Sequence, residues 1–405
     1  MRVDVLINER ENKGSTRVRI RKEWIIKYYP HPVLLLGPPG VGKSETVRRV
    51  ADLLAEGMRL ELVEYDGRDV EGDVFLFYDL RLTEVEPSEL IGVPREENGY
   101  MVYKPPKWAV LFSRHPGVLF LDELTNVQRE DVIAVAYKLL DGKAGEVRFH
   151  PGVWVVAAGN RPEDSVISRL LPAPLMNRLI RVDFDAPRLD EWISYMNAVY
   201  GEWDRRVAAY LGRFPDDFIR PPLDAAETLE NFPTPRSWTK LACMLPSISR
   251  GDGLNPHGGK GRRRGKHGCR GGADGEAVAA LCRGLLGEEV ADKFLTFIGN
   301  PTPSVAEVIR NPELFDGFSI DQKYIFSVMF AEWLSRRVGE RVRAALPLLR
   351  YLTRHREMLM FVFSSLREEV KGDFFRVLVK SDRETFFPVF REAGNLIARS
   401  VDWGV

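Results

Sequence analysis

The most constraining feature of this 405-residue sequence is the stretch HPVLLLGPPGVGKSETVRRVA at residues 31–51. An apolar run at 33–36 is followed by a loop of glycine and proline, and apolar positions then recur at helical spacing. The sequence therefore predicts a buried strand, a tight loop and an amphipathic helix. The buried face of this helix is expected to hold Val47, Val50, Ala51 and Leu54.

The loop itself, residues 37–44, fits the pattern G-x-x-x-x-G-K-[ST]. Glycines let successive backbone N–H groups turn toward phosphate oxygens, and the positive end of the next helix favours the same anion. Lys43 would supply a charge to the β- and γ-phosphates, and the Ser44 hydroxyl would be a ligand for Mg²⁺. The alternative is a Gly-Pro turn that only joins a strand to a helix. The candidate nucleotide-binding residues are Gly37, Pro38, Pro39, Gly40, Val41, Gly42, Lys43, Ser44 and Glu45.

A second motif, GVLFLDELTN at 117–126, places Asp122 and Glu123 at the end of an apolar strand. Carboxylates in that position are costly to desolvate unless a metal or hydrogen bonds compensate for the loss of water. Asp122 is the candidate for holding Mg²⁺ beside Ser44, and Glu123 for the base that polarises an attacking water. The structural alternative is that the two acids only cap the next helix.

Four more β-rich runs follow the first one, at 74–82, 117–122, 153–159 and 179–184. Continuously apolar strands that alternate with helical stretches indicate a parallel sheet buried on both faces. After Pro187 the spacing becomes helical, and Thr234 is a candidate cap for a helix that starts near Pro235. We expect an α/β domain with an N-terminal arm, a helical lid and a helical C-terminal region. Their predicted bounds are 1–187, 188–310 and 311–405, with a disordered glycine- and arginine-rich insertion at 250–275.

Composition restricts the class of protein further. Lys plus Arg and Asp plus Glu both number 58, so the chain as a whole has no electrostatic attraction for nucleic acid. No apolar run approaches the ~20 residues that span a bilayer, and no signal peptide is evident, so a cytoplasmic protein is expected. The basic tract GRRRGK at 261–266 keeps nucleic acid binding open as an alternative that is not favoured.

These motifs together resemble the AAA+ ATPases. The resemblance rests on GPPGVGKS, on FLDE, and on VVAAGN, whose Asn160 matches the sensor-1 polar residue of that family. LPAPLMNRLIRVDF resembles the MoxR branch and contains Arg178, the match to its arginine finger, although Asn177 and Leu179 depart from the branch's usual residues. ENFPTPRSW resembles the lid motif and makes Arg236 the match to the sensor-2 arginine.

The resemblance implies an ATP- and Mg²⁺-dependent ATPase that forms a ring, expected to be a hexamer, and remodels or activates a partner protein. The catalytic residues would be Glu123, Asn160, Arg178 and Arg236, with Arg178 acting on the neighbouring subunit's nucleotide. Arg169 is an alternative finger. A von Willebrand factor A-type protein is the expected partner. A nucleic-acid-dependent motor and a scaffold that binds ATP without turning it over are the alternative functions.

Overall fold

The computed structural model describes residues 2–7, 16–21, 31–165, 167–220, 231–249 and 273–392. The chain divides into two compact units, Met1–Ala186 and Pro187–Val405, which are described separately below. Their boundary lies one residue from the expected end of the α/β domain, and the further division at residue 310 stays a prediction. Within the described ranges, no helix has the length and apolar character needed to span a bilayer.

The first unit is built on a six-stranded sheet with the order β12-β3-β11-β8-β5-β4. Every neighbouring pair in this sheet is parallel. The expected fold class, a parallel α/β core followed by helices, is confirmed. The strands are β3 (Val33–Leu36), β4 (Glu61–Glu64), β5 (Val74–Arg81), β8 (Gly117–Asp122), β11 (Val153–Gly159) and β12 (Ile180–Asp183).

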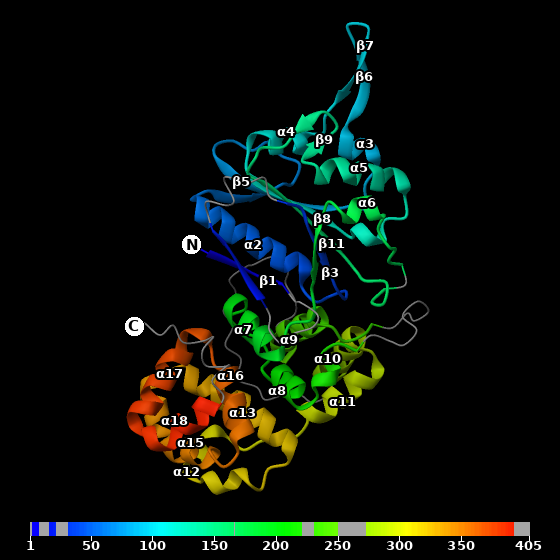
Figure 1. The fold of residues 1–405 in the computed structure, drawn as a ribbon. Helices are drawn as coiled ribbons and strands as arrows, with labels where there is room; N and C mark the ends of the chain where they lie inside the picture. Colours follow the sequence, from blue (N-terminus) through cyan, green and yellow to red (C-terminus); the bar gives the residue numbers. More distant parts are fainter. Residues whose placement is uncertain are drawn as a thin grey trace, which may run out of the picture. The chain divides into compact units, whose positions relative to one another are not determined.

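Helices cover both faces of the sheet (Figure 1). Helix α2 (Lys43–Met58) packs on one face, where Val47, Ala51 and Leu54 share a core with apolar side chains of the strands, while Val50 is only half-buried. The opposite face is covered by α3 (Pro87–Ile91), α4 (Lys107–Arg114), α5 (Glu130–Leu140) and α6 (Ala173–Met176). The three central strands β3, β8 and β11 are almost continuously apolar because side chains on both of their faces are largely buried.

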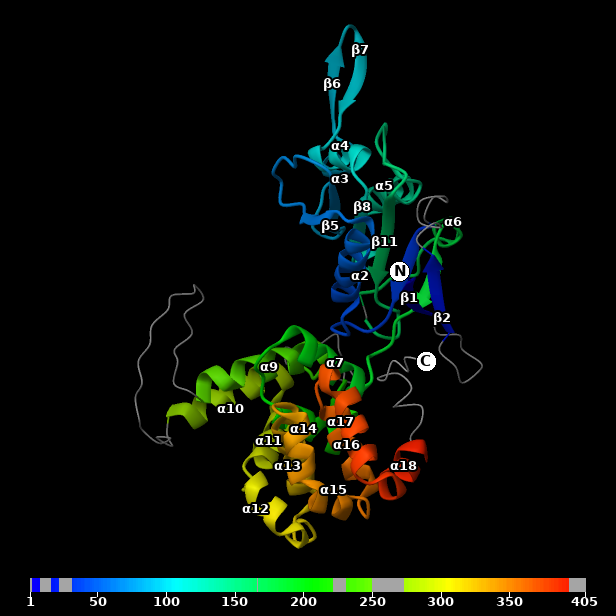
Figure 2. The same cartoon turned by 90° about the vertical axis from the view of Figure 1, so that its left-hand side faces the viewer.

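Three two-stranded antiparallel pairs accompany the sheet: β1 (Arg2–Ile7) with β2 (Thr16–Arg21), β6 (Val93–Glu97) with β7 (Tyr100–Lys104), and β9 (Lys143–Ala144) with β10 (Val147–Arg148). The β6–β7 hairpin projects from the α/β unit in both views (Figures 1 and 2). It turns at Asn98 and Gly99, which both have positive φ, as the tight turns of hairpins require.

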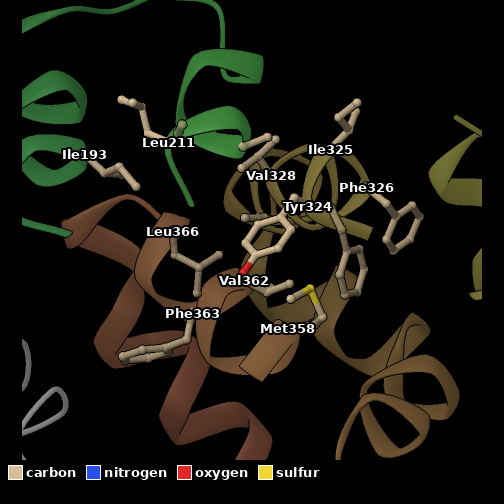
Figure 3. Packing of buried hydrophobic residues seen from close by; sticks show 14 of the residues in the cluster. Ile193, Leu211, Tyr324, Ile325, Phe326, Val328, Met358, Val362, Phe363 and Leu366 are labelled. Carbon is tan, nitrogen blue, oxygen red and sulfur yellow. The ribbon is translucent and has the colours of Figure 1, made fainter. Parts of the chain in front are cut away.

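The second unit is helical and has one continuous core (Figure 3). Its centre is α13 (Ile320–Ser335), whose buried residues include Tyr324, Ile325, Phe326 and Val328 and therefore lie around much of the helix. The other helices are α7 (Leu189–Val199), α8 (Arg206–Arg213), α9 (Pro235–Ser249), α10 (Ala273–Leu286), α11 (Glu288–Ile298), α12 (Val305–Arg310), α14 (Val338–Ala344), α15 (Leu346–Leu352), α16 (Arg356–Ser365), α17 (Glu368–Ser381) and α18 (Arg383–Glu392). Short 3-10 helices are also described: η2 (Pro215–Asp217) and η3 (Pro312–Phe315) belong to this unit, and η1 (Leu124–Asn126) follows β8 in the first unit.

Two local expectations in this unit can be compared with the structure. Thr234 caps α9, because its Oγ1 accepts a hydrogen bond from the Ser237 amide at 3.2 Å. The predicted insertion at 250–275 lies outside the described residues as far as residue 272. Its last three residues were predicted wrongly, since α10 already begins at Ala273.

Candidate nucleotide-binding site

The residues predicted to bind phosphate and metal, the predicted base and Asn160 lie at one edge of the sheet, whereas Arg178 precedes β12 and lies at the amino end of that strand. Strands β3, β8 and β11 are adjacent and parallel, so their carboxyl ends meet at this edge. The loop at 37–42 follows β3, Asp122 ends β8, and Asn160 follows β11. Ligands of open parallel sheets bind at such an edge.

Two glycines of the loop are fixed by their surroundings. A Cβ added to Gly37 would lie 1.8 Å from the carbonyl oxygen of Phe184, which leaves no room for a side chain. Gly42 caps the N-terminus of α2 with φ at 99°, a conformation that glycine adopts at little cost. The loop therefore approaches β12 closely and then directs its backbone into the start of α2.

Lys43 is buried at the centre of the loop. Its Nζ donates to the carbonyl oxygens of Gly37 and Pro38 at 2.7 and 2.9 Å, and to Oδ1 of Asn160 at 3.0 Å. These bonds hold the ammonium group where the N-terminus of α2 also favours negative charge. They also bring together two predicted residues that lie 117 positions apart in the sequence, Lys43 and Asn160.

Ser44 and Asp122 form the second predicted pair. Ser44 Oγ donates to Asp122 Oδ2 at 3.2 Å, and the other oxygen of Asp122 accepts from the Glu123 amide at 2.9 Å. A hydroxyl and a carboxylate at this separation are the hard oxygen ligands that Mg²⁺ prefers. The residues present therefore fit a magnesium ion held by Ser44 and Asp122.

Glu123 is held in an uncommon conformation beside this pair. Its backbone is left-handed, with φ at 59° and ψ at 29°, which few non-glycine residues adopt and which costs about 1–3 kcal/mol. Its carboxylate accepts a hydrogen bond of 2.7 Å from the hydroxyl of Thr83. Thr83 follows β5, the strand next to β8, and the sequence analysis did not identify it.

A network of polar side chains holds the backbone of Asn160 in place. Thr125 Oγ1 accepts from the Asn160 amide at 2.8 Å, and Ser168 Oγ lies 3.1 Å from both the Asn160 carbonyl oxygen and Asn126 Oδ1, two acceptors for its one proton. A Cβ on Gly159 would lie 2.5 Å from Thr125 Oγ1, so only glycine fits there. Thr125, near the end of the acidic motif, and Ser168 thus fix the backbone of Asn160 at the end of β11.

Asp79 is a further acidic residue close to the site that the sequence analysis missed. Burial, reinforced by the nearby charge of Asp122, raises its pKa to about 6. Its sequence context, FLFYDLRL, is the available signal, because a carboxylate follows a run of large apolar and aromatic residues within one strand.

The arginine candidates differ in how they are held. Arg178 donates to Asp141 Oδ1 and to the Pro174 carbonyl, at 3.1 and 3.0 Å, and its guanidinium lies over the Tyr137 ring. Arg169 lines a groove of about 470 Å³ together with Asn126, Gln128 and Ile167. Arg236 belongs to the helical unit, where its side chain is exposed in the first turn of α9. The roles of all three stay predictions.

Comparison with known proteins supports the nature of the α/β unit. Residues 33–184 match the family described as "ATPase family associated with various cellular activities (AAA)". The chain is 33% identical over 142 residues to the human ATPase family gene 2 protein homolog B, covering 33% of this chain and 15% of that protein. It is 34% identical over 104 residues to the ATP-dependent protease ATPase subunit HslU of Listeria welshimeri, covering 24% of this chain and 21% of HslU. The chain thus spans about a fifth or less of the length of these relatives.

Solved structures give weaker likenesses. The FIGL-1 AAA domain in complex with ADP aligns with a TM-score of 0.33 and 14% identity, over 72% of this chain and 79% of that one. PCH-2 of C. elegans aligns with a TM-score of 0.29 and 12% identity, over 58% of this chain and 61% of that one. The family match, together with the phosphate-loop geometry, supports the AAA+ P-loop superfamily for the α/β unit.

Proposed function

We propose that this protein is a MoxR-like AAA+ ATPase that hydrolyses ATP to remodel or activate a partner protein. One observation carries the proposal. The ammonium group of Lys43, the Ser44–Asp122 pair and the carboxylate of Glu123 converge at the carboxyl edge of the sheet. Phosphate, metal and water would each meet a residue of suitable chemistry there.

Each residue has a defined part in this proposal. Backbone amides at 40–44 and Lys43 would bind the phosphates, and Ser44 and Asp122 would hold magnesium, which neutralises charge on the phosphates when it is bound. Glu123 takes a proton from the water that attacks the γ-phosphorus. Asn160 is held by hydrogen bonds with Lys43 and Thr125, and in this proposal it orients the γ-phosphate.

The MoxR assignment and the assembly are supported by local sequence. The stretch LPAPLMNR ends at Arg178, next to the edge strand β12, where the branch carries its arginine finger. We propose that the chain assembles into a hexameric ring and that Arg178 completes the neighbouring subunit's site, with Arg236 of the lid acting on the nucleotide of its own subunit. Arg169 is the second candidate for the finger.

A protein partner is favoured by the β6–β7 hairpin. Tyr100 and Met101 at its tip are 75% and 72% exposed, and large apolar side chains left open in this way mark contact surfaces. The expected partner is of the von Willebrand factor A type.

The test of the function is phosphate release from ATP with Mg²⁺ by the assembled protein. Release no faster than that of a Lys43→Ala control would contradict it.

A further inference from the structure

Asp79 lies on the face of the sheet that α2 covers. On the same strand, Phe75 and Phe77 belong to the core between the sheet and α2. Side chains alternate along a strand, so Asp79, two residues beyond Phe77, points to the same side. It therefore extends the α2 face toward the carboxyl edge of β5.

Asp122 shares that face on the neighbouring strand. The register of β5 and β8 pairs Asp79 with Phe120 and Arg81 with Asp122. Phe120 also packs in the core under α2, and Asp122 accepts a hydrogen bond from Ser44 in the first turn of α2. Asp79 and Asp122 are thus diagonal neighbours beneath the start of α2.

The acidic residues around Asp79 have hydrogen-bond or ion-pair partners, whereas one carboxylate oxygen of Asp79 has no hydrogen-bond partner among the described residues. Asp122 is bound by Ser44 and by the Glu123 amide, and Glu64 on the other side pairs with Arg48. Oδ1 of Asp79 is buried and has no hydrogen-bond partner among the described residues. A buried carboxylate oxygen without a donor is costly, and the repulsion of Asp122 is larger than the attraction of Arg81.

We propose that Asp79 is a second carboxylate of the magnesium side of the nucleotide site, acting together with Asp122 on the ion that Ser44 binds. The inference rests on the proposed function, because it takes the ion to be the magnesium of bound ATP. A divalent cation would compensate both carboxylates at once and would give Oδ1 of Asp79 the partner that it lacks among the described residues. Asp79 is in this account a positioning residue for the ion and its water ligands.

The alternative is that Asp79 only supports the local packing of β5. The two explanations differ in what Asp79→Asn does, since asparagine keeps the size of the side chain and removes its charge. A packing role predicts the same metal affinity and a lower or unchanged melting temperature. A metal role predicts weaker metal binding and, in EDTA at pH 7.5, a melting temperature no lower than that of the parent, because repulsion from Asp122 is removed.

The test is titration of Mn²⁺, followed by electron paramagnetic resonance, into protein saturated with ADP. We expect Asp79→Asn to weaken Mn²⁺ binding about 10- to 100-fold, the usual cost of removing a residue that supports a metal ligand. ADP affinity in EDTA should be unchanged or higher. Glu64→Gln is the matched control, because Glu64 is exposed and already paired with Arg48, and its Mn²⁺ affinity should equal that of the parent.

Mn²⁺ affinity of Asp79→Asn within twofold of the parent would overturn the inference while leaving the proposed function intact. Equal loss of Mn²⁺ affinity in Glu64→Gln would also overturn it, since a general effect of surface charge would then suffice. A parent protein that binds no ADP at all contradicts the proposed function instead. Should Asp79→Asn fail to fold, Asp79→Ser is titrated in the same way and interpreted by the same two results.

Discussion

Thr83 Oγ1 donates a hydrogen bond of 2.7 Å to Oε2 of Glu123, the residue that we propose as the base. The two residues follow neighbouring strands, β5 and β8, and they are 40 positions apart in the sequence. Glu123 is also fixed through its amide by Asp122. Both its backbone and its side chain are therefore oriented by neighbours.

Thr83→Val tests whether this bond orients the base. Valine keeps the shape of threonine but cannot donate, so the carboxylate loses a charge-assisted bond of about 1.5–3 kcal/mol. We expect kcat for ATP hydrolysis to fall about tenfold while the dissociation constant for ATP stays the same. Thr83→Ser retains the hydroxyl and should keep most of the activity. A normal kcat in Thr83→Val would show that Thr83 does not orient Glu123.

Glu123→Gln separates binding from chemistry. Glutamine has nearly the same size but cannot accept a proton from water, so turnover should fall by about 10²–10⁴. ATP should remain bound, because Lys43 and the Ser44–Asp122 pair, which are proposed to hold the phosphates and the metal, are unchanged. Filter binding with labelled ATP and a phosphate-release assay measure the two effects. The trapped form is also the bait for capturing the partner, and turnover at the parent's rate would remove Glu123 as the base.

Arg178→Ala and Arg169→Ala distinguish the two candidate fingers. An arginine that reaches a neighbour's γ-phosphate contributes about 10³–10⁵ in rate and little to binding within its own subunit. We expect Arg178→Ala to abolish hydrolysis in the assembled state and Arg169→Ala to reduce it far less. Mixing Arg178→Ala with Glu123→Gln protein should restore some activity, because one kind of subunit boundary then has both residues intact. The reverse order of the two single variants would assign the finger to Arg169.

His150 predicts a pH dependence of stability. Burial, with a smaller effect of nearby His115, lowers the pKa of His150 below 6.5, and its Nδ1 accepts from the Gly152 amide at 3.0 Å. The unfolded chain then binds a proton more readily than the folded one, so the contribution is complete above pH 6.5 and is lost as the pH falls below it. His150→Asn keeps an acceptor for the amide but does not titrate. Urea unfolding between pH 7.5 and 5 should show a shallower loss for this variant, and parallel curves would contradict the assignment.

Much of the site was predictable because short motifs carry it. Residues 37–44 and 122–123 each combine a strand end with residues that bear the chemistry, so each motif could be recognised from its own short stretch of sequence. Asn160 was placed by the family resemblance, and the structure brings it to Lys43. Thr83 and Asp79 were missed because their importance depends on β5 lying beside β8, a neighbour relationship that sequence order does not state.

Prediction of the strands from the sequence has the same limit. The other five strands of the sheet were recognised from runs rich in apolar residues, whereas β4 was missed because its four residues, ELVE, end in exposed acids at the edge of the sheet. The β6–β7 hairpin was also missed, although the Asn98-Gly99 pair is a strong turn signal. Its strands are exposed nearly throughout, so the hydrophobic pattern used for the other strands is absent.

The central claim is that the loop around Lys43 binds the phosphates of ATP, and calorimetric titration of ATP with Mg²⁺ into folded protein tests it most directly. The account predicts saturable binding at one site per chain, and loss of that binding in Lys43→Ala protein whose circular dichroism is unchanged. Absence of binding in the parent protein, or equal affinity in the Lys43→Ala variant, would contradict it.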